Sequence, residues 1–313
     1  MSTSLIPLAY VVVLPGFLAL GGLAIEFVDR KLYARFQSRT GPPWYQPIAD
    51  SIKLLSKEAI VPRAADKPMF RMVPLVALAA TATAFFYIPL WSTHALHPFE
   101  GDAVVVLYLL TIPALCFFLA GWFSTSLFAS YGAIRTLTSL ISYEVPLFMA
   151  ILSPMILAGT WSLSGTVEFY QSHPTWPFFN VLGFVVAIVA LLGKLEKAPF
   201  DIPEAETELG GGTFVEYSGK LLALFRMTID IEAMVVATLV ASVFMPWGMN
   251  LHPVLVLALH AVKVFFIVFL IALTRTVMAR MRIEQMVNFC YKWLAPAAII
   301  QLLITILLSG VLK

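Results

Sequence analysis

Eight of the eighteen acidic residues in this sequence fall within one segment, residues 196–232, although only 12% of the chain is charged. The chain is also 60% hydrophobic, so several of these carboxylates are expected in an apolar environment. Burial and neighbouring charges shift the pKa of such a group, and a series of carboxylates and lysines can then pass protons along. The residue types and their spacing therefore indicate ion translocation as the chemistry of this segment.

The first group of candidate residues lies inside apolar runs, where a charge costs roughly 2.5 kcal/mol or more and usually has a function. Glu216 and Lys220 are four residues apart, and so are Arg226 and Asp230, a spacing that allows ion pairs on a helix. Structural ion pairs that only hold helices together are the alternative interpretation. The residues that we expect to serve ion translocation and coupling are Glu144, Glu216, Lys220, Asp230, Glu232 and Lys263.

Glu144 differs from the others because no basic residue lies near it in the sequence. Lys263, from a later apolar run, is its predicted partner across helices. A second group of acids continues the series out of the membrane, in the loop that contains "PFDIPEAETEL". These loop carboxylates, which we expect to face a partner protein, are Asp201, Glu204, Glu206 and Glu208.

The sequence lacks the motifs of other common active and binding sites. The sequence contains no glycine-rich phosphate loop, no helical histidine pair for zinc and no nucleophile elbow, and nothing in it predicts a nucleic-acid partner. Cys116 and Cys290 lie in apolar stretches without the spacing of metal ligands, so we predict no metal site in this chain. Gly210, Gly211 and Gly212 follow no strand, and we expect them to give flexibility or close backbone approach.

The elements that position these residues are membrane-spanning helices. The mean hydropathy is +0.89, and apolar runs of about 20 residues recur, the length needed to cross a bilayer as a helix. The runs are continuous and not alternating, which excludes a β-barrel. We therefore expect an all-α fold, one integral membrane domain over 1–313 with eight transmembrane helices, at about 5–26, 70–92, 103–128, 136–159, 178–195, 216–245, 253–274 and 288–311.

The connection after the first run has a pattern of its own. Between about residues 45 and 60, isoleucines and leucines alternate with Asp50, Lys53, Lys57 and Glu58. This pattern is typical of an amphipathic helix that lies along the membrane surface. The stretch "RTGPPWYQP" before it is stiffened by prolines and carries aromatic residues suited to the headgroup layer.

The positions of the basic residues predict the orientation of the bundle. Nine of the twenty lysines and arginines lie between Arg30 and Arg71, whereas the connections near 93–102, 160–177 and 246–252 contain none. Basic residues favour the cytoplasmic side. We therefore expect a multi-pass protein of the cell membrane with both termini outside and the long loops in the cytoplasm.

Several motifs carry a family resemblance. The segments "EKAPFDIPEAETEL", "VEYSGKLLALF", "SYEVP" and "RTVMARMRIEQ" resemble, in the same order, the eight-helix membrane subunit that joins the two arms of respiratory complex I. The resemblance implies a subunit that docks an iron–sulfur redox module and helps to couple electron transfer to ion translocation. With the charged residues before and within the amphipathic helix, it places a cytoplasmic interface at Arg39, Trp44, Gln46, Asp50, Lys53, Arg275, Arg280, Arg282 and Gln285.

The sequence departs from the usual complex I pattern in two places. Complex I subunits usually have a longer loop where this chain has the contracted residues 39–50, and the short form resembles the subunit of membrane-bound [NiFe] hydrogenases and related sulfur-reducing complexes. After "ALF", complex I subunits tend to have a carboxylate one position before Asp230. One position is about 100° around a helix, so the face of the helix that carries the ion path is left open.

The hydrogenase-type resemblance implies a membrane anchor and coupling subunit. The complex would take electrons from soluble ferredoxin and reduce protons or sulfur compounds. This chain would carry no cofactor, and the [4Fe-4S] clusters and the NiFe centre would belong to peripheral hydrogenase subunits. The other implied partners are antiporter-like membrane subunits and the lipid membrane. The alternatives are a quinone-site subunit of complex I, a secondary transporter, for which the inverted repeats are missing, and a structural scaffold.

Overall fold

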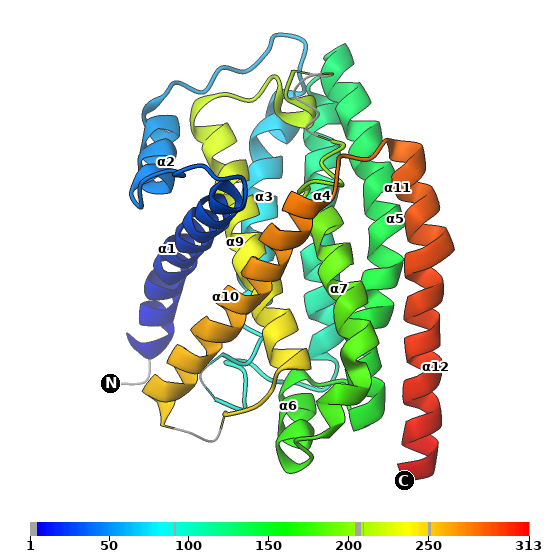
Figure 1. Cartoon of the computed structure of the whole chain (residues 1–313). Helices are drawn as coiled ribbons and strands as arrows, with labels where there is room; N and C mark the ends of the chain where they lie inside the picture. Colours follow the sequence, from blue (N-terminus) through cyan, green and yellow to red (C-terminus); the bar gives the residue numbers. More distant parts are fainter. Residues whose placement is uncertain (1–4, 91, 204–207, 209, 250–251, 313) are drawn as a thin grey trace.

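The computed structural model describes residues 5–90, 92–203, 208, 210–249 and 252–312, with only the backbone for 5–14, 253, 311 and 312. All regular secondary structure in these residues is helical, which confirms the predicted fold class (Figure 1). The elements are α1 (Leu5–Phe36), α2 (Gln46–Ser56), α3 (Lys67–Phe85), α4 (Asp102–Phe123), α5 (Leu127–Ala158), α6 (Leu163–Ser172), the 3₁₀ helix η1 (Trp176–Asn180), α7 (Val181–Lys194), the 3₁₀ helix η2 (Gly212–Phe214), α9 (Gly219–Phe244), α10 (Pro253–Val277), α11 (Ile283–Phe289), the π-helical turn η3 (Cys290–Leu294) and α12 (Ala295–Leu312).

Seven helices in the described part of the chain are long and apolar enough to cross a membrane. They are α3, α4, α5, η1 with α7, α9, α10, and α11 with η3 and α12. Each overlaps one of the expected spans. The first expected span lies within α1, which is not one of the seven, so its crossing stays a prediction and the count of eight with it.

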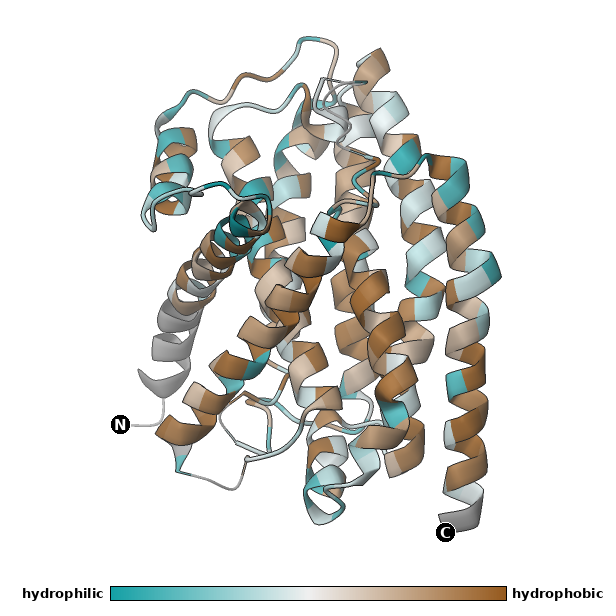
Figure 2. Cartoon of the chain, in the orientation of Figure 1, coloured by the Kyte–Doolittle hydropathy of each residue, from teal (hydrophilic) through white to brown (hydrophobic). Residues whose placement is uncertain are grey.

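The bundle has two chemically different ends. Figure 1 shows α2 at one end, together with the last turns of α1 and α10, and the last turn of α12 at the other end. Hydrophobic residues run along α10 and α12, whereas hydrophilic residues gather at the end that holds α2 (Figure 2). We call this the charged end, and the end with α6 and the end of α12 the opposite end.

The central helix of the bundle is α9. Every residue from Ile231 to Phe244 is buried, and the helix packs against α1, α2, α3 and α10. It approaches α1 closely at Gly22, where an added Cβ would lie 2.9 Å from backbone atoms of Asp230 and Ile231. Small residues allow such contacts between membrane helices because dispersion forces act only at short range.

Three helix ends differ from the expected ones because the backbone turns earlier than hydropathy indicates. Helix α3 ends at Phe85, before Pro89, and not near residue 92. Helix α4 ends at Phe123, because the turn at Thr125 has a φ of 53°, and α5 already begins at Leu127. Apolar side chains on both sides of this turn hide it from a hydropathy scan.

The residues at the start of α9 lie against the loop that follows α2. Gly219 has a φ of 56°, and a Cβ there would lie 2.3 Å from the carbonyl oxygen of Glu58. The backbone N–H of Ile60 donates to the hydroxyl of Ser218, 3.0 Å away. Helix α9 therefore begins only after Ser218, and Glu216 precedes it, in contrast to the expected span of 216–245.

Helix α2 is shorter than the expected 45–60, because Lys57 has an extended backbone. Its polar residues Gln46 and Asp50 contact each other across one turn. Its apolar residues Ile52 and Leu55 are exposed. This two-sided character agrees with the sequence pattern, while its position on a membrane surface stays a prediction.

Candidate functional site

A charged cavity of about 510 Å³ opens at the charged end, between α1, α2, α9, the segment after α7 and the end of α10. Its wall is unusual for a membrane protein, because ten of the fifteen lining side chains are charged and the two signs are balanced. The acids are Glu26, Asp29, Asp50, Glu196 and Asp230, and the bases are Arg30, Lys53, Lys197, Arg226 and Arg275.

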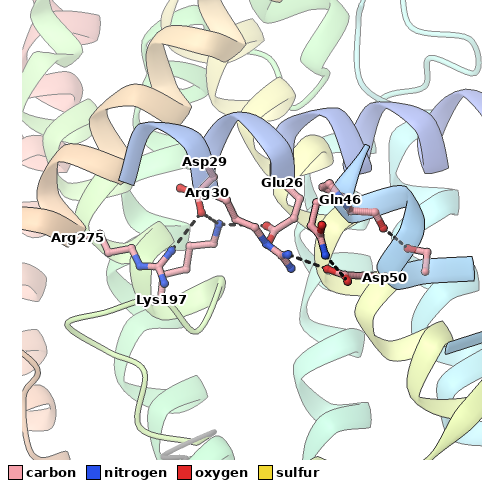
Figure 3. Close-up of polar contacts among 9 residues, drawn as sticks. Glu26, Asp29, Arg30, Gln46, Asp50, Lys197 and Arg275 are labelled. Carbon is pink, nitrogen blue, oxygen red and sulfur yellow. Dashed lines mark hydrogen bonds and ion pairs between the residues drawn. The ribbon is translucent and has the colours of Figure 1, made fainter. Parts of the chain in front are cut away.

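Asp29 joins three elements at the base of this cavity. Its side chain is 2% exposed, and Oδ2 lies 2.6 Å from Nζ of Lys197 and 3.2 Å from Nη1 of Arg275 (Figure 3). The guanidinium of Arg275 also stacks over the ring of Tyr33, 4.2 Å from its centroid. A buried carboxylate needs such partners, since an unpaired one costs several kcal/mol. Asp29 thereby fixes α1, the segment after α7 and the end of α10 to one another.

Arg30 connects α1 to α2 on the other side of the cavity. Its Nε lies 2.6 Å from Oε1 of Glu26, and its Nη1 lies 3.0 Å from Oδ2 of Asp50. The side-chain amide of Gln46 donates to the other oxygen of Asp50, also at 3.0 Å (Figure 3). The polar face of α2 is therefore turned toward the cavity. The expected interface residues Gln46, Asp50, Lys53 and Arg275 all meet here.

Two carboxylates of α9 point in different directions. Asp230 lines the charged cavity. Glu232 is two residues further, about 200° around the helix, and its Oε1 lies 2.7 Å from Nζ of Lys194 on α7. The two side chains of this ion pair are 2% and 4% exposed. Asp230 thus faces α1 and the charged cavity, and Glu232 faces α7. Which of these two faces carries the ion path stays open.

Lys194 also adjoins a third carboxylate, that of the half-buried Glu144. Glu144 on α5 lines the same small cavity as Lys194 and Tyr143, and its buried Oε1 has no hydrogen-bond partner among the described residues. The ammonium of Lys194 donates to the carbonyl oxygen of Leu110 as well. Lys194 therefore pairs with Glu232 and shares a small cavity with Glu144, at the junction of α4, α5, α7 and α9.

Lys263 does not have the predicted position beside Glu144. Its ammonium donates to the carbonyl oxygen of Trp247, in the loop that follows α9 at the opposite end. The prediction took a lysine of a later apolar run because Glu144 has no basic residue near it in the sequence. It was wrong because the helix packing brings Lys194, and not Lys263, to the small cavity that Glu144 lines.

The start of α9 also differs from the expectation. Lys220 is exposed and Glu216 is half-buried, and no ion pair joins the two within the described residues, because Glu216 precedes the helix. The other expected pair, Arg226 and Asp230, lines the charged cavity from one helix face. Of the candidates in α9, Asp230 lines the charged cavity and Glu232 is buried, whereas Lys220 is exposed.

A second polar surface surrounds the acidic loop. Nη1 of Arg135 lies 2.6 Å from Oε2 of Glu208, and the guanidinium of Arg280 donates to the carbonyl oxygen of Asp201 at 3.0 Å. The hydrogen bond and the charge of Arg135 hold the pKa of the exposed Glu208 below its usual value. Arg135, Glu208, Arg280 and Arg282 border a hollow of about 460 Å³. Glu204 and Glu206 lie outside the described residues.

The remaining expected interface residues are more scattered. Arg39 and Trp44 are exposed in the connection before α2, and the backbone N–H of Arg282 donates to Oε1 of Gln285 at the start of α11. Arg135 lies within α5, eight residues after its start, although the sequence placed it between two spans. No cluster of histidine, cysteine and acidic residues suited to a metal occurs in the described parts of the chain.

The sequence analysis missed four residues of the site: Glu26, Asp29, Lys194 and Lys197. The stretch "AIEFVDRK" does contain a signal, because Glu26, Asp29 and Arg30 end an apolar run at spacings that share one helix face. Lys194 and Lys197 were not singled out as candidates. Their partners come from α1 and α9, and no local pattern indicates such pairs.

The sequence matches a known protein family over almost its whole length. Residues 8–306 match the NADH dehydrogenase family. The chain belongs to this family. It is 35% identical over 306 residues to the H subunit of NADH-quinone oxidoreductase from Dehalococcoides mccartyi, covering 95% of this chain and 85% of that protein. It is 33% identical over 317 residues to NADH-quinone oxidoreductase subunit 8 of Thermus thermophilus, with 95% and 87% covered.

The fold has a solved counterpart in a related complex. A chain of the membrane-bound sulfane sulfur reductase, an archaeal respiratory membrane complex, superposes with a TM-score of 0.84 at 26% sequence identity, covering 94% of this chain and 97% of that one. This NADH dehydrogenase family member is therefore a multi-pass membrane subunit of a multi-subunit respiratory oxidoreductase complex related to complex I.

Proposed function

We propose that this chain is the membrane anchor and coupling subunit of an ion-translocating redox complex. It seats a cytoplasmic iron–sulfur module of the hydrogenase type on its charged end and links electron transfer in that module to proton or sodium movement. The clusters and the metal centre belong to the module, and antiporter-like subunits continue the ion path in the membrane. Soluble ferredoxin delivers the electrons.

The observation that carries this proposal is a series of charged side chains that extends from the surface into the bundle. The charged cavity opens at the end where the acidic loop lies, and Asp230 belongs to its wall. On the other face of α9, Glu232 and Lys194 form a buried pair, and Lys194 lines a small cavity together with Glu144. Charges this deep are expensive in a membrane, and a functional role explains their presence better than packing does.

The chemistry of coupling follows from electrostatics at short range. A charge that appears in the docked module changes the potential in the cavity, because the surrounding protein screens that charge less than bulk water does. A carboxylate that lines the cavity then binds a proton more or less tightly according to the sign of that charge. Lys194 shares its charge between Glu232 and Glu144, so a change in the protonation of one carboxylate alters the affinity of the other.

The proposed docking surface differs from the proposed ion path in the exposure of its ion pairs. Asp201, Glu208, Arg135 and Arg280 are paired at or near the surface, and pairs of this kind exchange partners at little cost. We propose that they re-pair with charged residues of the redox module. Neutral Asp201→Asn and Glu206→Gln variants should weaken the module's attachment or its activity, and normal activity with normal coupling in both would refute this role.

Two observations favour a hydrogenase-type or sulfur-reducing complex over a quinone reductase. The connection before α2 has the contracted sequence of residues 39–50, and a solved complex with the same fold is a sulfane sulfur reductase. The second candidate function is a quinone-site subunit. It is favoured by the names of the sequence relatives, which are subunits of NADH-quinone oxidoreductases.

The metal content of the native complex distinguishes these functions. The complex is purified through a tag on this chain, and nickel and iron are measured per copy. We expect stoichiometric nickel with many irons for a hydrogenase-type module. Iron without nickel would leave the anchor role standing for a sulfur-reducing module. Iron without nickel together with quinone-dependent turnover would instead establish the second candidate.

A further inference from the structure

A groove in the apolar half of the bundle carries a histidine that the ion path does not use. The groove has a volume of about 300 Å³ and lies between α1, α9 and α10. Only two of its fourteen lining residues, Thr238 and His260, have a side-chain nitrogen or oxygen. It shares no lining residue with the charged cavity.

His260 is deeply buried in this apolar wall. Its residue is 3% exposed, and neither ring nitrogen has a hydrogen-bond partner among the residues that the structure describes. A buried polar group without a partner costs about 1–3 kcal/mol. His260 therefore points to a bound group that supplies the missing hydrogen bond.

The groove opens toward the membrane and not toward water. Phe17, Leu257 and Phe265 at its rim are 38–49% exposed, as expected for side chains that face lipid. His260 is seven residues beyond the start of α10, about 10 Å along the helix. A ligand that reaches His260 therefore lies among apolar side chains, away from the start of α10.

The chemistry of the wall selects the ligand. A charged headgroup has no counter-charge among the lining residues, and an acyl chain leaves His260 unpaired. A water molecule usually makes two to four hydrogen bonds, and Thr238 and His260 are the two lining residues with a side chain that can take part in them. An apolar cavity of roughly 150 Å³ already binds benzene, so the larger groove has room for a ring with part of a chain.

We propose that this groove binds a neutral lipophilic molecule from the membrane that presents a carbonyl or hydroxyl oxygen to His260. A neutral imidazole offers one N–H donor and one acceptor nitrogen, so either oxygen type can pair with it. This site goes beyond the proposed coupling function, because it faces lipid and is separate from the charged cavity.

A photoreactive probe tests the proposal in the intact complex. The complex is placed in phosphatidylcholine nanodiscs with 4-decylbenzophenone, whose carbonyl accepts a hydrogen bond and, on irradiation, reacts with neighbouring C–H groups. Mass spectrometry of peptides should find the label on residues of the groove, such as Met234 and Phe17. His260→Leu should lower this labelling about fivefold to tenfold, which corresponds to the loss of one hydrogen bond.

Matched variants separate binding from a loss of folding. His260→Gln keeps a hydrogen-bonding group and should retain most of the labelling, whereas Ala261→Phe should block the groove. Ala79→Phe, at an exposed position of α3, is the control and should change nothing. Native gels verify assembly of each variant. Equal labelling in His260→Leu and the wild type, equal loss in the Leu and Gln variants, or label spread evenly over α12 and other lipid-facing helices would each overturn the proposal.

Discussion

At the scale of single residues, Lys194 is the first to test, because its ammonium pairs with the buried Glu232 and lines the same small cavity as Glu144. We predict that Lys194→Met destabilises the complex by about 3–5 kcal/mol, since it leaves Glu232 buried without a counter-charge. The midpoint of thermal unfolding, measured in detergent by the fluorescence of a fused reporter during size exclusion, should fall clearly.

The double variant is the control for this effect. Replacing Glu232 by leucine together with Lys194→Met removes both charges and keeps the apolar volume, so most of the lost stability should return. If the double variant unfolds as early as the single one, the pair is not the source of the loss, and packing around α7 is.

Glu144 allows a test of coupling without a large change in shape. Glu144→Gln keeps the size and hydrogen bonding of the side chain but cannot hold a proton. We predict that electron transfer continues while ion translocation falls close to background. The ratio of ions moved to electrons transferred, measured in proteoliposomes that contain the whole complex, gives this result directly.

Glu168→Gln provides the matched comparison, because Glu168 is exposed on α6 at the opposite end. Its ratio should equal that of the wild type. A normal ratio in Glu144→Gln would mean that the buried carboxylates only hold helices together, which was the structural alternative for these charges.

At the scale of elements, the crossing of α1 and α9 decides whether the cavity keeps its shape. We predict that Gly22→Ala destabilises the bundle by about 1–3 kcal/mol, because its Cβ would lie 2.9 Å from the backbone of Asp230. The helices would have to separate, and Asp230 would shift relative to Glu26. Both the unfolding midpoint and the coupling ratio should fall.

Gly16→Ala in the same helix separates this contact from a general effect of alanine. A Cβ at Gly16 has no heavy atom within 4 Å, so that variant should be as stable as the wild type or slightly more stable. Equal effects of the two substitutions would contradict the close crossing.

The elements also show which part of the fold could be predicted. The interiors of the spans follow from hydropathy, because each is an apolar run near 20 residues long. The ends could not be predicted in the same way. Thr125 has a positive φ in a turn between two apolar helices. Gly219 lies so close to a carbonyl group of the loop after α2 that a side chain would not fit. Such ends depend on backbone contacts between distant segments.

The same limit applies to the candidate site. Asp230, Glu232 and Glu144 could be singled out, since a carboxylate in an apolar run is rare by itself. Their partners could not, because Lys194 meets Glu232 and Glu144 only through the packing of three helices. Sequence identifies a costly charge, and the fold decides which other charge offsets it.

At the scale of the whole molecule, the distribution of charge argues for one orientation in the membrane. The connection between α3 and α4, the one between α5 and α7 and the one between α9 and α10 contain no lysine or arginine. The loops of the charged end contain many. The positive-inside rule therefore predicts that the charged end faces the cytoplasm, where the redox module of the proposed function would lie.

Single introduced cysteines test this orientation. The native Cys116 and Cys290 are 4% and 0% exposed, so a membrane-impermeant maleimide should leave both unreacted. We predict that Thr175→Cys, at the opposite end, is labelled in intact cells. Thr40→Cys, in the exposed connection before α2, should be labelled only after the cells are permeabilised.

The reverse pattern would have consequences for the whole proposal. If Thr40→Cys reacted in intact cells, the charged cavity and the acidic loop would face outward, and no cytoplasmic redox module could dock there. Labelling of both positions in intact cells would exclude a charged end buried against such a module. The predicted pattern places the cavity, Lys194 and Glu144 in order from the cytoplasm inward, as coupling to a cytoplasmic module requires.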